Sequence, residues 1–225
     1  MNNHSKNIPN IVKNLTIFKN ISVFEIDNIA LFATLNNVKK NKILFFKEQE
    51  IKFFYILIKG SAILFENDNK GNRYITQLLG EGDIIGDVFT KNFVFSSYCN
   101  EECQILAIPI NYILELTKNN LVFSNNLLKE IVAKNYKILN LLTLHKSVNA
   151  KFRILQFFQS LAFENNKDNN VINLKFSKAV IASYLNIKPE TFSRILQDLK
   201  NCGEIEVNGN EITIYNDTIY KYKLK

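Results

Sequence analysis

Long apolar runs and cysteines are scarce in this 225-residue chain, and each scarcity excludes a class of protein. No run of about 18 apolar residues occurs, so we expect no membrane-spanning helix. The first residues, MNNHSKNIPNIVKN, lack the apolar segment of a secretory signal. Three cysteines cannot build a disulfide framework and fit a reducing compartment, which predicts a cytoplasmic protein.

Histidine is also rare, since the chain has only two. Neither falls in residues 38–109, so an enzyme with metal ligands on adjacent strands of that region is disfavoured, and we expect no enzyme. Positive charge, in contrast, is in excess: the net charge is +7 and the pI is about 9.2. This balance favours a polyanionic partner such as nucleic acid, although a compositional bias towards Lys and Asn explains it equally well.

Regions of different character follow one another along the chain. Residues 15–34 have helical spacing, with Ser22 as the cap of a short helix. Residues 38–109 are rich in β-branched and aromatic residues between turn clusters, which predicts many short strands in a sandwich or barrel. Residues 123–148 return to helical spacing.

The helix predicted at 123–148 carries an apolar seam with the spacing of a coiled coil. The seam consists of Leu128, Ile131, Asn135, Ile138 and Leu142. A polar residue such as Asn135 at one such position tends to fix register. A second edge, made of Leu127, Val132 and Leu139, remains for contact with the barrel. We therefore predict a homodimer, the alternative being a helix that packs only on its own barrel.

The last third of the chain reads as two helices, a turn and a hairpin. Ser177 is a good N-cap for KAVIASYL, and Pro189 suits the first turn of PETFSRILQDLKN. Asn208-Gly209 predicts a two-residue turn between EIEV and EITIY. This order is that of a winged helix-turn-helix, whose second helix enters the major groove of DNA.

That second helix presents side chains suited to reading bases. Glu190, Ser193 and Arg194 are spaced i, i+3, i+4 and share one face. Arginine pairs with guanine O6 and N7, and glutamate accepts from cytosine N4. Alternatively, Glu190 only stabilises the helix dipole from the first turn, and Arg194 is a solvent-exposed cation without a DNA contact. The predicted DNA-binding set is Ser177, Lys188, Glu190, Thr191, Ser193 and Arg194.

These residues resemble a known family. AVIASYLNIKPETFSRILQDLKNCGEIEVNGNEITIYN is similar to the DNA-binding pattern of the Crp/Fnr family of bacterial transcription regulators, while FYILIKGSAILF and LLGEGDIIGDVF resemble its cyclic-nucleotide-binding-type β-roll. The resemblance implies an α+β fold with a β-roll (a double-stranded β-helix or jelly roll), a long dimerisation helix and a winged helix-turn-helix. The implied boundaries are 1–122 for the sensor, 123–148 for the dimerisation helix and 149–225 for the DNA-binding domain.

The resemblance also implies a function. A member of this family would bind palindromic double-stranded DNA as a homodimer, contact RNA polymerase, and act as an activator or a repressor. Glu190, Ser193 and Arg194 are similar to the Fnr-type reading set, which implies a TTGA half-site, because Pro189 stands where the Crp-type set has a further arginine. Asn186 departs from the family's usual turn glycine, but asparagine tolerates the left-handed conformation.

The effector region implied by the resemblance is Gly86, Asp87, Phe89, Phe95, Ser96, Ser97, Ile138 and Leu139. Cyclic AMP is disfavoured there. Asp87 replaces the family's ribose-binding glutamate, and no arginine in residues 87–110 could neutralise a phosphate. Ile138 and Leu139 occupy the positions at which the Crp-type members that this chain resembles have hydroxyl side chains in contact with the base of cyclic AMP. An iron–sulfur cluster is disfavoured because the N-terminal segment has no cysteine.

Three modes of sensing stay open. The first is haem in a phenylalanine-rich pocket, with His145 as a ligand. The second is a thiol switch at Cys99 and Cys103, which needs a turn between them, since four residues of strand would separate them by about 13 Å. The third is a regulator without a ligand, controlled by its own abundance.

Overall fold

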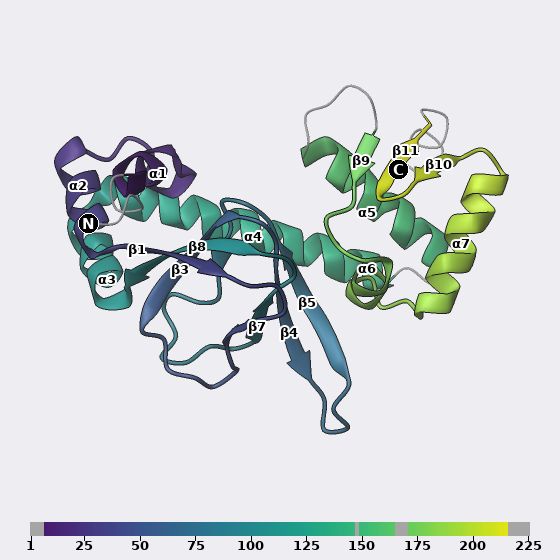
Figure 1. The fold of residues 1–225 in the computed structure, drawn as a ribbon, viewed down its shortest axis with the longest axis horizontal. Coiled ribbons are helices and arrows are strands. Elements are labelled where there is room, and N and C mark those ends of the chain that lie inside the picture. The colour runs from purple at the N-terminus through teal and green to yellow at the C-terminus, as the bar shows by residue number, and fades with distance from the viewer. Residues whose placement is uncertain (1–6, 147–148, 165–170, 216–225) are drawn as a thin grey trace. The chain divides into compact units, whose positions relative to one another are not determined.

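The computed structural model describes residues 7–146, 149–164 and 171–215 (Figure 1). The chain divides into two compact units, Met1–Asn135 and Tyr136–Lys225. Within the described ranges, no helix has the length and hydropathy that crossing a bilayer requires.

The first unit opens with short helical segments. They are α1 (Ile8–Asn14), the 3₁₀ turn η2 (Thr16–Phe18) and α2 (Val23–Phe32). Ser22 caps α2, because its Oγ accepts from the N–H of Glu25 at 3.2 Å and donates to the Glu25 carboxylate at 2.9 Å. The predicted cap is therefore confirmed, whereas the predicted helical segment 15–34 contains the 3₁₀ turn, the non-helical residues 19–22 and α2, and its last residue already belongs to β1.

The described strands of this unit form two four-stranded antiparallel sheets, ordered β1-β8-β3-β6 and β2-β7-β4-β5. The strands are β1 (Thr34–Val38), β2 (Ile43–Phe45), β3 (Phe53–Lys59), β4 (Ala62–Asn67), β5 (Arg73–Leu79), β6 (Ile84–Ile85), β7 (Ser96–Cys99) and β8 (Cys103–Pro109). Pairing between strands distant in sequence, such as β1 with β8, rolls the chain into the predicted barrel.

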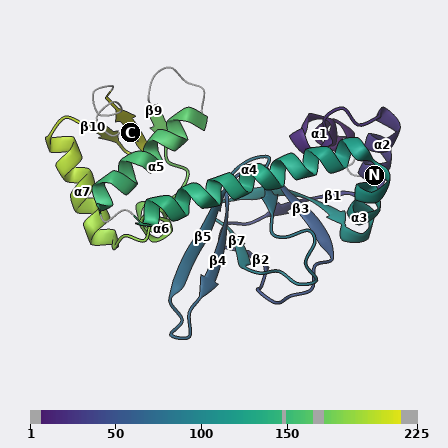
Figure 2. The ribbon, with the colours of Figure 1, turned by 180° about the vertical axis from the view of Figure 1, so that it is seen from behind.

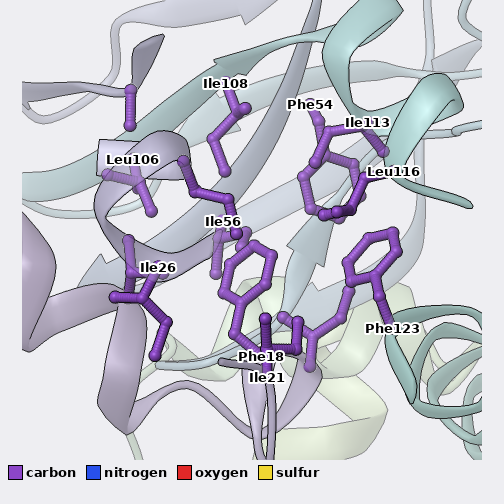
Figure 3. Packing of buried hydrophobic residues seen from close by; sticks show 14 of the residues in the cluster. Phe18, Ile21, Ile26, Phe54, Ile56, Leu106, Ile108, Ile113, Leu116 and Phe123 are labelled. Carbon is purple, nitrogen blue, oxygen red and sulfur yellow. The ribbon is translucent and has the colours of Figure 1, made fainter. Parts of the chain in front are cut away.

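Helices α1, α2 and α3 (Ile110–Asn119) gather beside the first turns of α4 in both views of the chain (Figures 1 and 2). Figure 3 shows the core that joins these helices to the roll. The rings of Phe18 and Phe123 stack at 5.6 Å, and Ile56 and Leu106 meet them from the sheet. Burying one such side chain contributes about 1.5–3 kcal/mol, so this cluster anchors the start of α4 on the roll.

The long helix α4 runs from Leu121 to Lys146 and agrees with the helix predicted at 123–148, beginning two residues earlier (Figure 2). The last two predicted residues, 147 and 148, lie outside the described ranges. The side chain of Asn120 starts it, since its Oδ1 accepts from the N–H of Phe123 at 2.9 Å. The amide of Asn120 also donates to Glu25, which ties α4 to α2.

The second unit contains α5 (Ala150–Glu164), β9 (Val171–Asn173), α6 (Lys178–Tyr184), α7 (Pro189–Asn201), β10 (Ile205–Asn208) and β11 (Glu211–Ile214). Its strands are ordered β10-β11-β9. Strand β9 was not predicted, because three residues show no periodicity. The hairpin pairs Asn208 with Glu211, so its turn is Gly209-Asn210, one residue later than predicted.

Candidate DNA interface and sensor interior

Helices α6 and α7 form the predicted helix-turn-helix. Ser177 caps α6, because its Oγ accepts from the N–H of Val180 at 3.3 Å. Helix α7 turns Phe192, Leu196 and Leu199 into the core of the unit, where each is at least 95% buried. A strongly one-sided apolar face of this kind leaves the opposite face of α7 to solvent.

The turn between the helices depends on one residue in a left-handed conformation. Asn186 has φ +53°, as expected from its place where the family uses glycine. The N–H of Ile187 then donates back to the carbonyl of Ala182 at 2.8 Å, and the side chain of Ile187 is buried. This closed turn fixes where α7 begins.

The predicted reading residues lie together on the open face of α7. Glu190, Ser193 and Arg194 are exposed, and Thr191 is half-buried in the first turn. Lys188 is exposed at the N-cap, and no side chain caps this end of the helix. First-turn N–H groups of a helix have no intrahelical partner, so this end suits a phosphate oxygen. The arrangement can therefore present one carboxylate, one hydroxyl and one guanidinium to base edges.

Positive charge is concentrated in the same half of the chain. Residues 136–225 contain 13 Lys and Arg against 8 Asp and Glu, whereas residues 1–135 contain 15 against 13. Most of the net charge of +7 thus belongs to the unit that carries α7. A duplex would be attracted to this unit by the general field as well as by individual contacts.

The apolar seam of α4 differs from the prediction. Leu127 is buried, and Ile131 packs against the core of the first unit. Val132, assigned by sequence to the barrel edge, is instead 44% exposed, so its assignment was wrong. Leu139, assigned to the same edge, is 57% exposed and belongs to the second unit. The exposed stripe consists of Leu128, Val132, Asn135, Leu139 and Leu142, while Ile138 is half-buried. This stripe keeps the 4-3-4-3 spacing of a coiled-coil seam.

Aromatic rings fill the interior of the β-roll. Phe45 and Phe93 stack with 3.5 Å between ring centroids, and Tyr55 lies 5.9 Å from Phe45. Burial raises the pKa of the Tyr55 hydroxyl. Both phenylalanines are at most 2% exposed. The space between the two sheets is therefore occupied by the protein's own side chains.

The residues assigned to the effector pocket surround this aromatic filling. Gly86 backs onto it, because a Cβ there would stand 2.8 Å from Phe93 Cε1. Asp87 accepts from the N–H of Val94 at 3.0 Å, and Ser96 Oγ accepts from the N–H of Lys47 at 2.9 Å. Ser97 is fully buried, and its Oγ has no hydrogen-bond partner among the described residues.

The two phenylalanines of the predicted effector pocket differ in burial. Phe95 packs partly against the interior of the roll, whereas Phe89 is 60% exposed. Ile138 and Leu139 belong to the second unit. The described structure thus brings Gly86 and Phe95 to the roll interior but leaves the ring of Phe89 in solvent.

Lys134 is a cation that the sequence interpretation missed. Its Nζ donates to the carbonyl oxygen of Gly86 at 3.2 Å. Burial lowers the pKa of Lys134, and the carboxylates of Asp87 and Asp83 oppose that shift. Its position seven residues after the buried Leu127 was the available signal, since such spacing returns to the same helix face. The first unit therefore has a positive charge beside the GDIIGD segment, supplied by α4 and not by an arginine.

Cys99 and Cys103 lie on either side of a tight turn. Strand β7 ends at Cys99 and β8 begins at Cys103, so residues 100–102 bring both side chains into one buried cluster. The Cys103 thiol donates to the carbonyl of Ser61 at 3.1 Å. Burial, followed by the neighbouring Cys103, raises the pKa of Cys99 to about 12. A thiol with so little thiolate at neutral pH is a poor nucleophile, which favours a purely structural role in the core over a thiol switch.

His145, the predicted haem ligand, is engaged within the second unit. Its Nε2 lies 3.0 Å from the carbonyl oxygen of Tyr184, so a metal at that nitrogen would have to displace this contact. No group of three His, Cys, Asp or Glu side chains that could hold a metal occurs in the described ranges. His145 therefore does not offer a free Nε2 to haem.

Two family models match the chain and together span more than half of it. Residues 35–120 match the cyclic nucleotide-binding domain, and residues 152–217 match the Crp-like helix-turn-helix domain. The first covers the strands of the roll and α3. The second contains α6, α7 and the hairpin.

Among characterised proteins, the chain is 22% identical over 197 residues to the anaerobic regulatory protein of Aggregatibacter actinomycetemcomitans, covering 85% of this chain and 76% of that protein. It is 23% identical over 177 residues to the cAMP-activated global transcriptional regulator CRP of Salmonella typhimurium, covering 74% of this chain and 82% of that one. Both relatives are regulators, and the alignments span both units.

Solved structures share the fold. FixK2 from Bradyrhizobium japonicum superposes with a TM-score of 0.78 at 16% identity, covering 86% of this chain and 98% of that one. A CooA mutant from Carboxydothermus hydrogenoformans gives 0.73 at 19% identity, covering 85% and 87%. With both domain matches in the order roll, long helix and helix-turn-helix, the chain belongs to the Crp/Fnr family of DNA-binding transcription regulators.

Proposed function

We propose that this regulator binds, as a homodimer, a palindrome of TTGA-type half-sites, and that it responds to an effector other than cyclic AMP. The observation that carries the half-site is the exposed set Glu190, Ser193 and Arg194 on α7. A bidentate arginine–guanine pair and a glutamate–cytosine contact discriminate by about 1–3 kcal/mol each. RNA polymerase is a further proposed partner, supported by family membership alone.

The exposed stripe of α4 supports the homodimer. Leu128, Leu139 and Leu142 each expose more than half of their surface. Burying such a side chain contributes about 1.5–3 kcal/mol, and Asn135 within the stripe would align two copies in register. A two-fold dimer also explains why the operator would be a palindrome, since each half-site meets one copy of α7.

The interior of the roll supports an effector other than cyclic AMP. Phe45 and Phe93 occupy the space between the sheets, and Asp87 is already bonded to the N–H of Val94. Lys134 is the cation beside Gly86, but its ammonium already donates to the carbonyl there. A phosphate bound at this place would therefore have to displace contacts that the protein makes with itself.

The same filling supports a second candidate function, a regulator without a small-molecule ligand that is controlled by its abundance. Native mass spectrometry of the purified protein separates the two. A mass equal to that of two chains alone, together with tight operator binding, supports the ligand-free mode. An additional stoichiometric mass supports an effector.

The half-site is tested by fluorescence anisotropy on duplexes carrying TTGA, TGTGA or TTAA palindromes at one salt concentration. Wild-type protein is expected to prefer TTGA. Arg194→Met should weaken TTGA binding by about 10–100-fold and should no longer distinguish TTGA from TTAA palindromes, because the guanine contact is lost. Lys200→Met is the matched control, since it removes one exposed positive charge from the same helix. An Arg194→Met protein that still preferred TTGA to TTAA would contradict the half-site proposal.

The dimer is tested with Leu142→Asp, which places a charge in the exposed stripe. Sedimentation is expected to show a monomer, and palindrome binding should fall even though Leu142 reads no base. Asn140→Asp adds the same charge at an exposed position outside the stripe and should leave the dimer intact. A Leu142→Asp protein that remained dimeric and bound normally would place the interface elsewhere.

A further inference from the structure

Two side chains form hydrogen bonds with backbone carbonyl groups at the end of α6 and in the turn between α6 and α7. His145, near the end of α4, places Nε2 at 3.0 Å from the carbonyl oxygen of Tyr184. Arg153, in the first turns of α5, donates from Nη2 to the carbonyl oxygen of Asn186 at 3.3 Å. The end of α6 and the turn that precedes α7 are thus hydrogen-bonded to side chains of two other helices, α4 and α5.

The contact made by His145 follows from how α6 ends. The last four carbonyls of a helix have no intrahelical partner. The carbonyls of Ile181, Ala182 and Ser183 accept from backbone N–H groups of the turn, and that of Tyr184 receives His145. Because a carbonyl oxygen can only accept, Nε2 must carry the hydrogen. His145 therefore adds a side-chain bond at the one end of α6 that faces the turn.

We propose that His145 is a positioning residue that fixes the helix-turn-helix on the end of α4 and so sets the half-site spacing that the dimer accepts. The inference rests on the proposed palindrome and homodimer. It adds a specificity determinant that touches no DNA and lies outside the reading face of α7.

The connection from the dimer stripe to the reading face is short. Leu142 precedes His145 by three residues on one helix, a rise of about 4.5 Å. Tyr184, on the other side of the hydrogen bond, ends α6, and α7 begins at Pro189. Movement of α7 relative to Leu142 would have to break or bend this contact. Each dimer would contain it twice.

Because DNA is helical, a fixed position of the two α7 helices would make the dimer selective for the spacing between half-sites. Inserting one base pair between half-sites moves them apart by about 3.4 Å and rotates one against the other by about 35°. A dimer whose two α7 helices are held firmly accepts one separation and rejects its neighbours. A dimer with a loosened turn gives up affinity at the best separation and tolerates the others better.

The test uses full-length protein and a series of TTGA palindromes whose central spacer changes by one base pair at a time. Wild type should select one spacer. His145→Ala should lose about tenfold in affinity there, about what losing one hydrogen bond in each of two protomers predicts, and should discriminate less between spacers. His145→Gln, whose amide can still donate to the carbonyl, should recover most of the preference. His4→Ala, the replacement of the other histidine, should behave as wild type.

Controls separate positioning from folding and from failure of the proposed function. Dimerisation by sedimentation and the thermal unfolding midpoint should be unchanged in His145→Gln, which keeps the comparison valid if His145→Ala folds poorly. If wild type selects a spacer and both His145 variants match it, the positioning role is refuted. If wild type itself ignores TTGA palindromes, the proposed function fails first, whatever His145 does.

Discussion

Replacing Gly86 by alanine tests whether Phe45 and Phe93 fill the space behind Gly86 in the interior of the roll. Gly86 has φ +94°, a conformation that costs a residue with a Cβ about 1–2 kcal/mol. The new Cβ would also stand 2.8 Å from Phe93 Cε1 and 3.0 Å from Phe45 Cζ. Those rings stack at 3.5 Å and are buried, so they have little room to retreat. Overpacking of this kind costs about 1–3 kcal/mol, which brings the expected loss of unfolding free energy to about 2–5 kcal/mol.

Gly82 offers a matched control on the same stretch of chain. Its φ is +89°, but a Cβ there would meet nothing within 4 Å. Gly82→Ala should therefore show the backbone cost alone, about 1–2 kcal/mol. The difference between the two variants, about 1–3 kcal/mol, isolates the crowding by Phe45 and Phe93.

The assay is urea unfolding followed by circular dichroism, with calorimetry to assign the transition of the unit that contains the roll. Combining Gly86→Ala with Phe93→Leu should cost less than the sum of the single changes, because the smaller side chain removes the nearest clash. Equal losses for Gly86→Ala and Gly82→Ala, or strict additivity in the double variant, would show that the rings do not fill the space behind Gly86.

Two further predictions concern single residues. Since the pKa of Cys99 is raised from 9.0 to about 12, the folded chain keeps a proton that the unfolded chain releases, and stability should fall as pH rises from about 9 towards 12. Cys99→Ala should flatten that fall in pH-dependent urea midpoints, and an unchanged slope would contradict the assignment. Asn186→Val should cost about 1–2 kcal/mol because a β-branched residue resists φ +53°, while Asn186→Gly should stay within about 0.5 kcal/mol, both read from thermal unfolding. Equal effects of the two changes would argue against the left-handed turn.

Elements defined by local chemistry were predictable. The caps at Ser22 and Ser177 and the proline at the first turn of α7 all stand where the sequence placed them. These signals act over three or four residues, so neighbouring residues suffice to specify them.

Elements defined by distant partners were not predictable. Strand β9 exists because β11 pairs with it, and three residues show no period of their own. The apolar spacing of α4 fitted two adjacent faces, and only packing against the roll decided that Ile131 is covered and Val132 exposed. A hairpin turn shifted by one residue, at Gly209-Asn210, likewise followed strand pairing.

By itself, the sequence determined the order of the domains and the exposed face of α7, because a helix with period 3.6 and a buried Phe192 leaves Glu190, Ser193 and Arg194 on the opposite side. Tertiary structure decided what fills the interior of the roll and what contacts the end of α6. It placed Lys134 against Gly86, stacked Phe93 on Phe45 and joined His145 to Tyr184. Each of these contacts joins residues dozens of positions apart, and such encounters depend on how sheets and helices pack rather than on any local pattern.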